Sequence, residues 1–436
     1  MTDQRVPVHG GRLRPRERDA IVAALRAGMV PRVGQQHIQV GRAAEVQAAA
    51  HDVDRIADGG AGCRFVIGEY GSGKTFFLHL VRSIALEKRL VTIHADLSPD
   101  RRLHASSGQA RGLYAELMRN LATRARPDGG ALASVVERFV TGALDEANAI
   151  SDDPADAIKS RLATLAESTG GYDFAAVVGA YWRGYDSGDE RLRADAVRWL
   201  RGEFTSRVDA RAALGVRTII DDGTFYDHLK LMARFVRLAG FNGLLVCLDE
   251  MVNLHKITGS AVRNANYEQV LRIVNDSTQG SAEHIGFLFG GTPEFLMDPR
   301  RGLFSYPALA SRLAPNRFAS TDRVDNSGLV IRLGNLTPED VYVLLTKVRH
   351  VYASGDPARY LVPEEALTAY MAHCATRLGD AYFRTPRETI RGFLDLLALL
   401  EQHPDLHWSS LIGSVDLTAA ANPDGRPDDE LTSFQL

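Results

Sequence analysis

The stretch CRFVIGEYGSGKTFF, residues 63–77, decides the fold. An apolar run typical of a buried strand ends at Gly68, and a helical pattern begins at Lys74. The spacing Gly68-x4-Gly73-Lys74-Thr75 between them matches the P-loop, or Walker A motif, in the strand–loop–helix context that the motif requires. Glycines let backbone N–H groups turn toward phosphate oxygens, and the helix N-terminus adds partial positive charge. The sequence therefore predicts a nucleotide-binding loop.

We expect Lys74 to reach the β- and γ-phosphates of the nucleotide and the Thr75 hydroxyl to bind Mg²⁺. The predicted cofactors are thus ATP and Mg²⁺. The loop residues assigned to the nucleotide are Gly68, Glu69, Tyr70, Gly71, Ser72, Gly73, Lys74, Thr75 and Phe76.

Further strands and helices alternate around this loop. Short apolar runs predict strands over 63–68, 90–96, 243–250 and 285–292, helical periodicity predicts helices over 16–28, 43–58 and 74–88, and 37–42 reads as a short extended piece. Such alternation is typical of an α/β fold with a parallel sheet and flanking helices. The long interval 97–240 is mostly helical in pattern, which predicts an insertion between two strands.

A pair of carboxylates ends the apolar strand GLLVCLDE, residues 243–250. Charges at the tip of a buried strand are costly unless they face a cation or water. Asp249 fits a Walker B residue that holds Mg²⁺, and Glu250 fits the base that polarises the attacking water. The alternative is a strand that ends in solvated acids. A DE pair favours ATP hydrolysis over phosphoryl transfer to a small metabolite.

Composition places limits on the class of protein. The 436 residues include 51 Lys and Arg and 54 Asp and Glu, so the net charge is −3 and no global positive field favours nucleic acid. Three distant cysteines indicate neither a disulfide framework nor a zinc site. No apolar run reaches the roughly 20 residues of a membrane span, and the N-terminus has no signal-peptide pattern. We expect a cytoplasmic protein without a membrane partner.

Two more segments resemble AAA+ ATPases. VGRAAEV (40–46), with Gly41 and Arg42 at its centre, is similar to the box on the adenine side of the nucleotide. FGGTPEFL (289–296) ends the strand after Walker B, and Thr292 there fits the sensor 1 role of contacting the γ-phosphate or the lytic water. Because Pro293 follows, Thr292 also fits a helix N-cap, and both roles are compatible.

The AAA+ resemblance also implies arginine roles. In these proteins an arginine from one subunit reaches the γ-phosphate held by the next, and Arg312 is our first candidate, ahead of Arg317, Arg300 and Arg301. The alternative for Arg312 is a salt bridge within its own subunit. Arg387, just after Pro386 at a helix start, fits the sensor 2 arginine of an α-helical lid, with Arg384 as competitor.

The joint presence of ADLSPDRRLH (95–104), NYEQVLRIVNDSTQG (266–280) and GGTPEFLMDPRRGLFSYPALASRL (290–313) is more specific than the single ATPase motifs. Together they resemble the ATP-binding proteins of bacterial BREX phage-defence systems, the BrxD-like P-loop family, and more distantly the initiator and helicase-loader branch of AAA+ proteins. The resemblance implies a homo-oligomeric ring or arc on duplex DNA that recruits or loads a partner such as a helicase. Unlike origin-binding relatives, the chain has too few residues after the lid for a winged helix.

On this basis we expect six regions in the chain. They are 1–36, an N-terminal extension with a helix; 37–96, the first part of the AAA+ core; 97–240, a helical insertion; 241–333, the second part of the core; 334–412, a helical lid; and 413–436, a flexible tail.

Duplex DNA then requires a local basic patch. Residues 101–130 carry six arginines against two acids, a net of +4, and residues 131–190 carry four basic against eleven acidic residues, a net of −7. The basic piece fits phosphate, and the acidic piece fits a basic protein partner, although solvated helix faces explain both equally well. The candidates are Arg101, Arg102, Arg111, Arg119, Arg124 and Arg126, and then Lys230, Arg234 and Arg237 on one side of 225–238.

Two other hypotheses remain open. One is an oligomerising signalling switch that hydrolyses ATP without loading anything on DNA. The other is a small-molecule kinase, which Glu250 beside Asp249 and Arg387 on a lid disfavour. We also expect NYEQ (266–269) to be a surface between subunits.

Overall fold

The computed structural model describes residues 13–150, 153–319, 323–378 and 386–412. The chain falls into two compact units. The sheet unit comprises Arg42–Glu69 and Gly73–Leu333, and the helical unit comprises Met1–Gly41, Tyr70–Ser72 and Gly334–Leu436. Residues 413–436, for which a flexible tail is predicted, lie outside the described residues.

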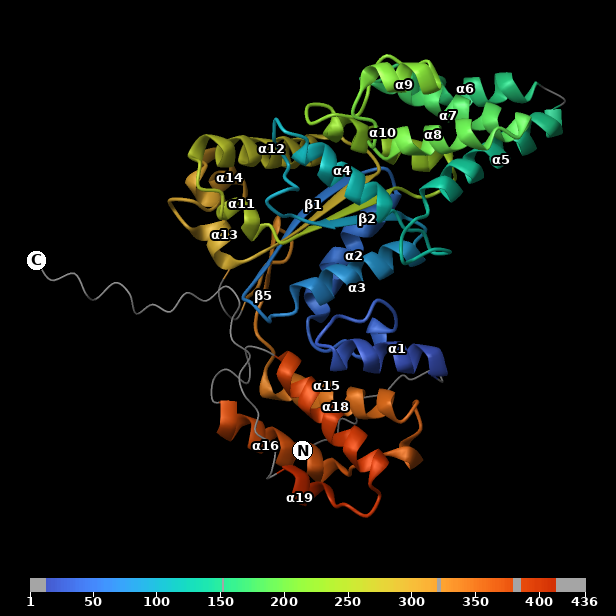
Figure 1. Ribbon diagram of the computed structural model, residues 1–436. Coiled ribbons are helices and arrows are strands. Elements are labelled where there is room, and N and C mark those ends of the chain that lie inside the picture. The colour runs from blue at the N-terminus through green and yellow to red at the C-terminus, as the bar shows by residue number, and fades with distance from the viewer. Residues whose placement is uncertain (1–12, 151–152, 320–322, 379–385, 413–436) are drawn as a thin grey trace, which may run out of the picture. The chain divides into compact units, whose positions relative to one another are not determined.

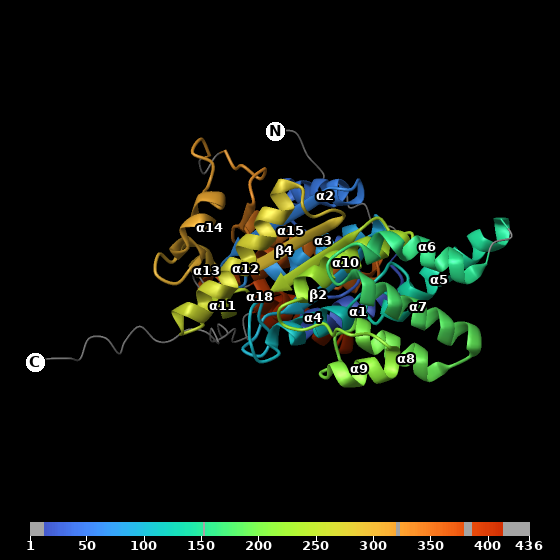
Figure 2. The same ribbon diagram turned by 90° about the horizontal axis from the view of Figure 1, so that it is seen from above.

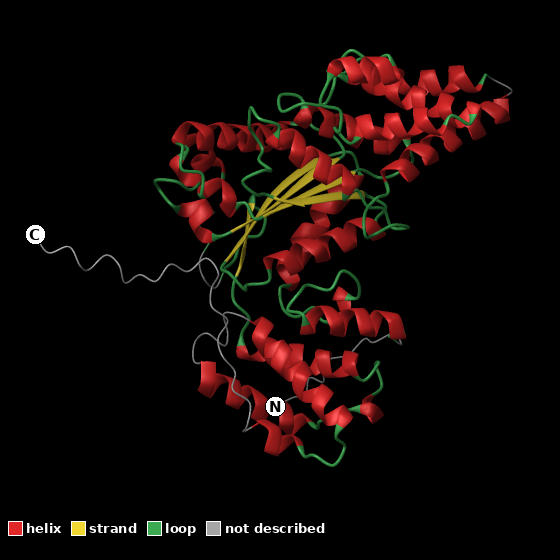
Figure 3. Ribbon diagram, viewed as in Figure 1, coloured by secondary structure: helices red, strands yellow, loops and turns green. Residues whose placement is uncertain are grey.

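Within the described residues, the sheet unit is built on a five-stranded parallel sheet in the order β2-β3-β4-β1-β5 (Figures 1 and 3). This confirms the predicted α/β class. Because all strands run the same way, their carboxyl ends meet at one edge, where ligands of such sheets bind. The strands are β1 (Ala61–Gly68), β2 (Val91–Asp96), β3 (Leu244–Asp249), β4 (Ile285–Gly291) and β5 (Val330–Leu333).

Helices cover both faces of the sheet, which explains why its strands are apolar runs rather than alternating patterns. Helices α2 (Ala43–Ala57) and α3 (Lys74–Glu87) pack on one face, and α4 (Gln109–Arg119), α10 (Phe225–Leu238) and α12 (Ser260–Gln279) on the other (Figure 1). In β1, Val66 joins the first core, whereas Phe65 and Ile67 join the second. Each such buried side chain contributes roughly 1.5–3 kcal/mol.

Seven helices of the described chain lie between β2 and β3, and the outer ones extend beyond the sheet (Figure 2). They share one hydrophobic core with the sheet through α4 and α10. Trp199 is buried in that core and its indole N–H donates to the Thr218 carbonyl at 2.9 Å. The helices between α4 and α10 are α5 (Leu132–Ile150), α6 (Pro154–Ala166), α7 (Gly171–Ser187), α8 (Glu190–Leu200) and α9 (Arg207–Leu214).

Two sequence-based expectations about strands were wrong. The extended piece expected over 37–42 is instead a 3-10 turn, η1 (Gln35–His37), followed by a bend in which Gly41 and Arg42 both take left-handed backbone angles, φ 60° and 58°. The edge strand β5 was not predicted. It has only four residues, too few for a periodic signal.

The helical unit combines both ends of the described chain, because α1 packs against α15 and α18. Helix α15 begins at a capping box in which the Thr337 side chain accepts from the Asp340 N–H and the Asp340 side chain accepts from the Thr337 N–H. None of the described helices is long and apolar enough to cross a membrane. The helices are α1 (Pro15–Arg26), α15 (Pro338–Tyr352), η3 (Pro357–Arg359), α16 (Glu364–Leu378), α18 (Pro386–Gln402) and α19 (Trp408–Ile412).

Candidate active site

The glycine-rich loop joins β1 to α3 at the carboxyl edge of the sheet. Gly71 and Gly73 have φ values of 83° and 82°, a left-handed conformation that favours glycine. The Lys74 ammonium donates hydrogen bonds to the carbonyls of Gly68 and Glu69 at 2.8 and 2.9 Å. The lysine therefore lies inside the turn of its own loop, where the following helix N-terminus also points.

The two halves of the predicted metal site meet directly. The Thr75 hydroxyl, in the first turn of α3, donates to the Asp249 carboxylate at 2.7 Å. Asp249 ends β3 and is buried. Its carboxylate lies so close to β4 that a Cβ on Gly290 would be 2.2 Å from Asp249 Oδ1. A glycine at that point of β4 is therefore required for the carboxylate to take this position.

Glu250 follows Asp249 at a sharp bend. It has a left-handed φ of 56°, an uncommon and costly conformation for a residue with a side chain. The bend is held from both sides. The Glu250 N–H donates to Asp249 Oδ1 at 2.9 Å, and the N–H of the buried Met251 donates to the Gly290 carbonyl at 2.9 Å. The exposed Glu250 side chain is thereby carried out of the line of β3.

Burial and the surrounding carboxylates act on the pKa of Lys74 in opposite directions. Burial lowers the pKa of Lys74, and the nearby carboxylates of Asp249, Glu250 and Glu69 oppose that shift. Loss of water around the ammonium makes its charge costly in the absence of a close anion. A phosphate group is an anion of the kind that this position favours.

Asp96 is a further carboxylate at the site that sequence reasoning did not assign. It ends β2 and pairs in register with Asp249 on β3. Partial desolvation and the neighbouring Asp249 charge raise the pKa of Asp96. Asp96 is the last residue of a predicted strand, which was the only signal for it in the sequence. The signal becomes informative only when this strand is known to lie beside the Walker B strand, and a single sequence does not specify strand order.

Thr292 follows β4 and caps the short helix α13 (Pro293–Met297) by accepting a hydrogen bond from the Phe295 N–H at 3.4 Å. Thr292 thus has the N-cap role that its position before Pro293 predicts. Because β4 lies between β1 and β3, Thr292 is at the carboxyl edge of the sheet between the P-loop strand and the Walker B strand. Its contact with a nucleotide stays a prediction.

Gly41 and Arg42, the predicted adenine-side pair, lie where the chain passes from the helical unit to the sheet unit. The Arg42 guanidinium lies beside the P-loop, since a Cβ on Gly73 would be 3.3 Å from Arg42 Nη1. A Cβ on Gly41 would be 3.0 Å from Asp340 Oδ1 in α15. Substitution at either glycine is therefore disfavoured by both space and backbone conformation.

The candidate arginines differ in how they are held. Arg312 ends α14 (Pro307–Arg312) and is exposed; its Nε–H donates to the Asn275 amide oxygen and its Nη1–H to the Ala308 carbonyl, both at 2.8 Å. Among the described residues it therefore has neutral partners in its own subunit, not the salt bridge weighed as the alternative. Arg317 and Arg300 are also exposed, whereas Arg301 donates to the Ile257 carbonyl at 3.2 Å.

Arg387 lies in the first turn of α18, in the helical unit. Within that unit its side chain runs alongside Gly28, where an added Cβ would be 3.0 Å from Arg387 Cδ. Its competitor Arg384 lies outside the described residues. The sensor 2 role of Arg387 stays a prediction.

The first group of predicted DNA-binding arginines has carboxylate neighbours. Arg101 lies 3.5 Å from Glu116, and Arg119 lies 3.4 Å from both Glu116 and Glu203. Arg124 and Glu87 are 3.0 Å apart. The acids at 87 and 203 lie outside the segment over which the net charge of +4 was counted, so part of that charge is compensated in three dimensions. Arg111 donates to the Phe204 carbonyl at 3.4 Å, and Arg102 is half-buried.

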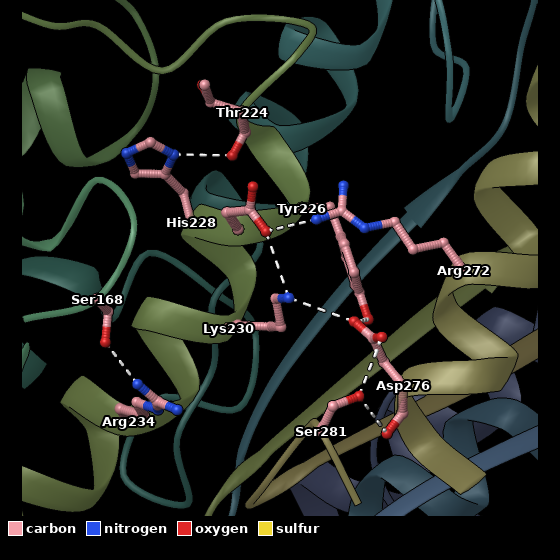
Figure 4. A network of polar contacts seen from close by, with 10 residues as sticks. Ser168, Thr224, Tyr226, His228, Lys230, Arg234, Arg272, Asp276 and Ser281 are labelled. Carbon is pink, nitrogen blue, oxygen red and sulfur yellow. Dashed lines mark hydrogen bonds and ion pairs between the residues drawn. The ribbon is translucent and has the colours of Figure 1, made fainter. Parts of the chain in front are cut away.

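The second group, on α10, is also engaged (Figure 4). Lys230 lies 3.3 Å from Asp227 and 3.2 Å from Asp276 of α12. Arg234 donates to the Ser168 hydroxyl at 2.5 Å. Arg237 donates to the Phe241 carbonyl at 2.9 Å.

The motif NYEQ was wrongly expected at a surface, because Asn266 and Tyr267 are fully buried. The Asn266 amide accepts from the His104 N–H at 2.9 Å and donates to the His104 carbonyl at 3.1 Å, so it joins α12 to the SPDRRLH segment. The Tyr267 hydroxyl donates to the Arg301 carbonyl at 2.5 Å. These motifs thus hold together the loops around the sheet edge.

Comparison with protein families gives one match over most of the chain. The model of the family described as BREX system ATP-binding protein BrxC/D matches residues 13–416. No curated protein matches the chain.

Proposed function

Because the chain belongs to the BREX system ATP-binding protein BrxC/D family, we propose that it hydrolyses ATP with Mg²⁺ in the cytoplasm as part of phage defence. The observation that carries this proposal is the 2.7 Å hydrogen bond between the Thr75 hydroxyl and the Asp249 carboxylate. These groups are oxygen ligands of the kind that Mg²⁺ prefers. The residues present therefore fit a nucleotide and its metal.

In this proposal each residue at the edge has one task. Lys74 and the loop N–H groups bind the phosphates, Thr75 and Asp249 bind Mg²⁺, and Glu250 accepts a proton from the attacking water. Bound Mg²⁺ neutralises charge on the β- and γ-phosphate oxygens. Thr292 hydrogen-bonds the γ-phosphate or the water.

We further propose an AAA+ arrangement with the six regions predicted from the sequence, in which Gly41 and Arg42 line the adenine side and Arg387 acts from the lid. Arg312 of one subunit would complete the site of the next. Two exposed apolar residues that follow Arg312 in the sequence support an interface: Phe318 is 90% exposed and Val324 is 65% exposed. Burying one large apolar side chain contributes about 1.5–3 kcal/mol to association.

The work done with ATP is, in this proposal, assembly of a ring or arc on duplex DNA and recruitment of a helicase or other partner of the defence system. Family membership supports a partner from the BREX system. The DNA contact would come from Arg101, Arg102 and Arg111 or from the basic side of α10.

A second candidate function is an oligomerising ATP switch that does not load anything on DNA. The ion pairs of Arg101, Arg119, Arg124 and Lys230 with carboxylates favour it, because a paired cation offers less to phosphate. Salt-dependent DNA binding separates the two functions.

The catalytic assignment is tested with Lys74→Ala and Glu250→Gln in isothermal titration and ATPase assays. We expect Lys74→Ala to lose ATP affinity, and Glu250→Gln to keep it while turnover falls by about 10²–10⁴. Lys88→Ala, just after the same helix, is the matched control and removes only a partly exposed ion pair with Asp54. Unchanged ATP binding by Lys74→Ala contradicts the assignment.

A further inference from the structure

Asn275 and Arg312 make a contact between α12 and α14 that no motif predicted. The amide oxygen of Asn275 accepts the Arg312 Nε–H at 2.8 Å, and the Ala308 carbonyl accepts an Nη1–H at the same distance. Arginine has five N–H donors, and among the described residues two of them are engaged, by Asn275 and Ala308. The guanidinium is held at an exposed position.

Both acceptors are neutral, so the guanidinium of Arg312 keeps its positive charge. A carboxylate at position 275 would hold the guanidinium equally well but would cancel its charge, which is what a trans-acting arginine supplies to the transferred phosphoryl group. An amide oxygen fixes the orientation and leaves the charge intact. A fixed orientation also reduces the side-chain entropy that is lost when the arginine engages the neighbouring site.

The turn of α12 that carries Asn275 is itself fixed by the next residue. Asp276 accepts hydrogen bonds from the Tyr226 hydroxyl at 3.0 Å, Lys230 at 3.2 Å and the Ser281 hydroxyl at 3.1 Å (Figure 4). Burial opposes ionisation of this carboxyl, but Lys230 and these hydrogen bonds lower the pKa of Asp276. Adjacent residues of α12 thus face two partners, Asp276 toward α10 and Asn275 toward α14.

We propose that Asn275 is a positioning residue for Arg312, which orients the guanidinium toward the ATP site of a second copy of this chain without neutralising it. The proposal rests on the proposed function, in which Arg312 acts in trans. Asn275 touches neither ATP nor the reacting atoms of its own subunit in this scheme. Its effect is therefore expected in turnover and not in ATP binding.

The test uses the full chain with Asn275→Asp, Asn275→Ala and the matched control Asn264→Ala, an exposed asparagine of the same helix. Asn275→Asp keeps the shape of the side chain and adds the neutralising charge, so we expect kcat to fall roughly tenfold, part of the ~10³ or more that such an arginine contributes. Asn275→Ala should reduce kcat by a few-fold, and KM should change by less than about twofold in both. Asn264→Ala should match the parent protein.

A mixing experiment distinguishes positioning from general damage. Lys74→Ala subunits bind no ATP in this scheme but present an intact Arg312, so adding them to Asn275→Asp subunits should raise activity above that of either variant alone. No gain on mixing, or full activity of both Asn275 variants while Arg312→Ala is inactive, overturns the positioning role. Full activity of Arg312→Ala itself overturns instead the trans-acting arginine of the proposed function.

Discussion

The carboxyl edge of the sheet and the position of Lys230 on α10 hold their charges in different ways. At the edge, Lys74 donates to two backbone carbonyls, and Asp249 accepts from a hydroxyl and a backbone N–H. On α10, Lys230 lies between two carboxylates, and Asp227 also pairs with Arg272 at 2.8 Å. Lys74 and Asp249 thus have neutral hydrogen-bond partners, whereas Lys230 has carboxylate partners; Arg234 and Arg237 of the same helix donate to neutral oxygens.

The difference indicates which charges are prepared for a ligand. Charges with neutral hydrogen-bond partners keep their field and are oriented in advance, an arrangement found where pKa values are perturbed at functional sites. Ion pairs near the surface contribute only about 0–1 kcal/mol to folding stability, and their charges are already compensated within the protein. By this criterion Arg312, held by an amide and a carbonyl, resembles Lys74 at the sheet edge more than it resembles Lys230 on α10.

Gly290→Ala should have the largest effect among variants that leave every charge in place. The added Cβ would lie 2.2 Å from Asp249 Oδ1, so the carboxylate must move, which disturbs its hydrogen bonds with the Glu250 N–H and with Thr75. Displacement of a reacting group by about 1 Å costs on the order of 10²-fold in rate, and we expect a loss of kcat of that size in steady-state ATPase assays.

The matched control for that variant is Gly328→Ala. A Cβ on Gly328 meets no atom within 4 Å, so activity and thermal midpoint should stay close to those of the parent protein. If Gly290→Ala hydrolyses ATP as fast as this control, the position of Asp249 is not important for catalysis, and the contrast between the two regions loses its basis.

The strands and the glycine-rich loop at this edge were predictable from the sequence because they are short continuous segments. Spacing around Gly68 and Lys74 and the acids ending 243–250 suffice to identify the loop and both strands. Contacts between distant segments are different. Asp96 beside Asp249 and Glu203 near Arg119 depend on strand order and helix packing, which local patterns do not encode. The same limit explains why Asn266 was placed at a surface although it is buried and joins α12 to the backbone of His104.

DNA binding is the next test, with an intermediate effect. If the chain loads a partner on duplex DNA, Arg101→Ala, Arg102→Ala and Arg111→Ala combined should weaken binding roughly tenfold at low salt. The log–log salt dependence should also flatten by roughly 0.9 for each phosphate that the variant no longer neutralises. Fluorescence anisotropy of labelled duplex with ATP, on the Glu250→Gln background, measures both quantities.

Arg207→Ala, Arg211→Ala and Arg198→Ala provide a matched triple control of three exposed arginines elsewhere in the sheet unit. An unchanged slope in the first triple variant places the DNA surface elsewhere. Absence of binding even at low salt favours the switch function, in agreement with the ion pairs that surround these arginines.

The smallest expected effect concerns the buried side of α10 and depends on pH. His228 is buried, and its Nδ1–H donates to the Thr224 carbonyl at 2.8 Å (Figure 4). Its ring centroid lies 5.7 Å from that of Trp199. Burial lowers the pKa of His228, although the Thr224 carbonyl and nearby aspartates oppose the shift. The unfolded chain then binds more protons below the ordinary histidine pKa of about 6.5, so stability is intact above that pH and falls as the pH decreases through it.

His228→Phe keeps an aromatic ring in this core and removes the titration. We therefore expect the variant to lose less stability than the parent protein between pH 7.5 and pH 5.5 in urea unfolding followed by tryptophan fluorescence. Between these two pH values, the loss of unfolding free energy in the two proteins should differ by about 1.4 kcal/mol for each unit by which the pKa of His228 is lowered. His403→Gln, which removes an exposed imidazole, should leave the pH dependence unchanged. If His228→Phe and the parent protein lose equal stability, burial does not lower the pKa of His228 in the folded chain, and the inner side of α10 titrates like an exposed histidine.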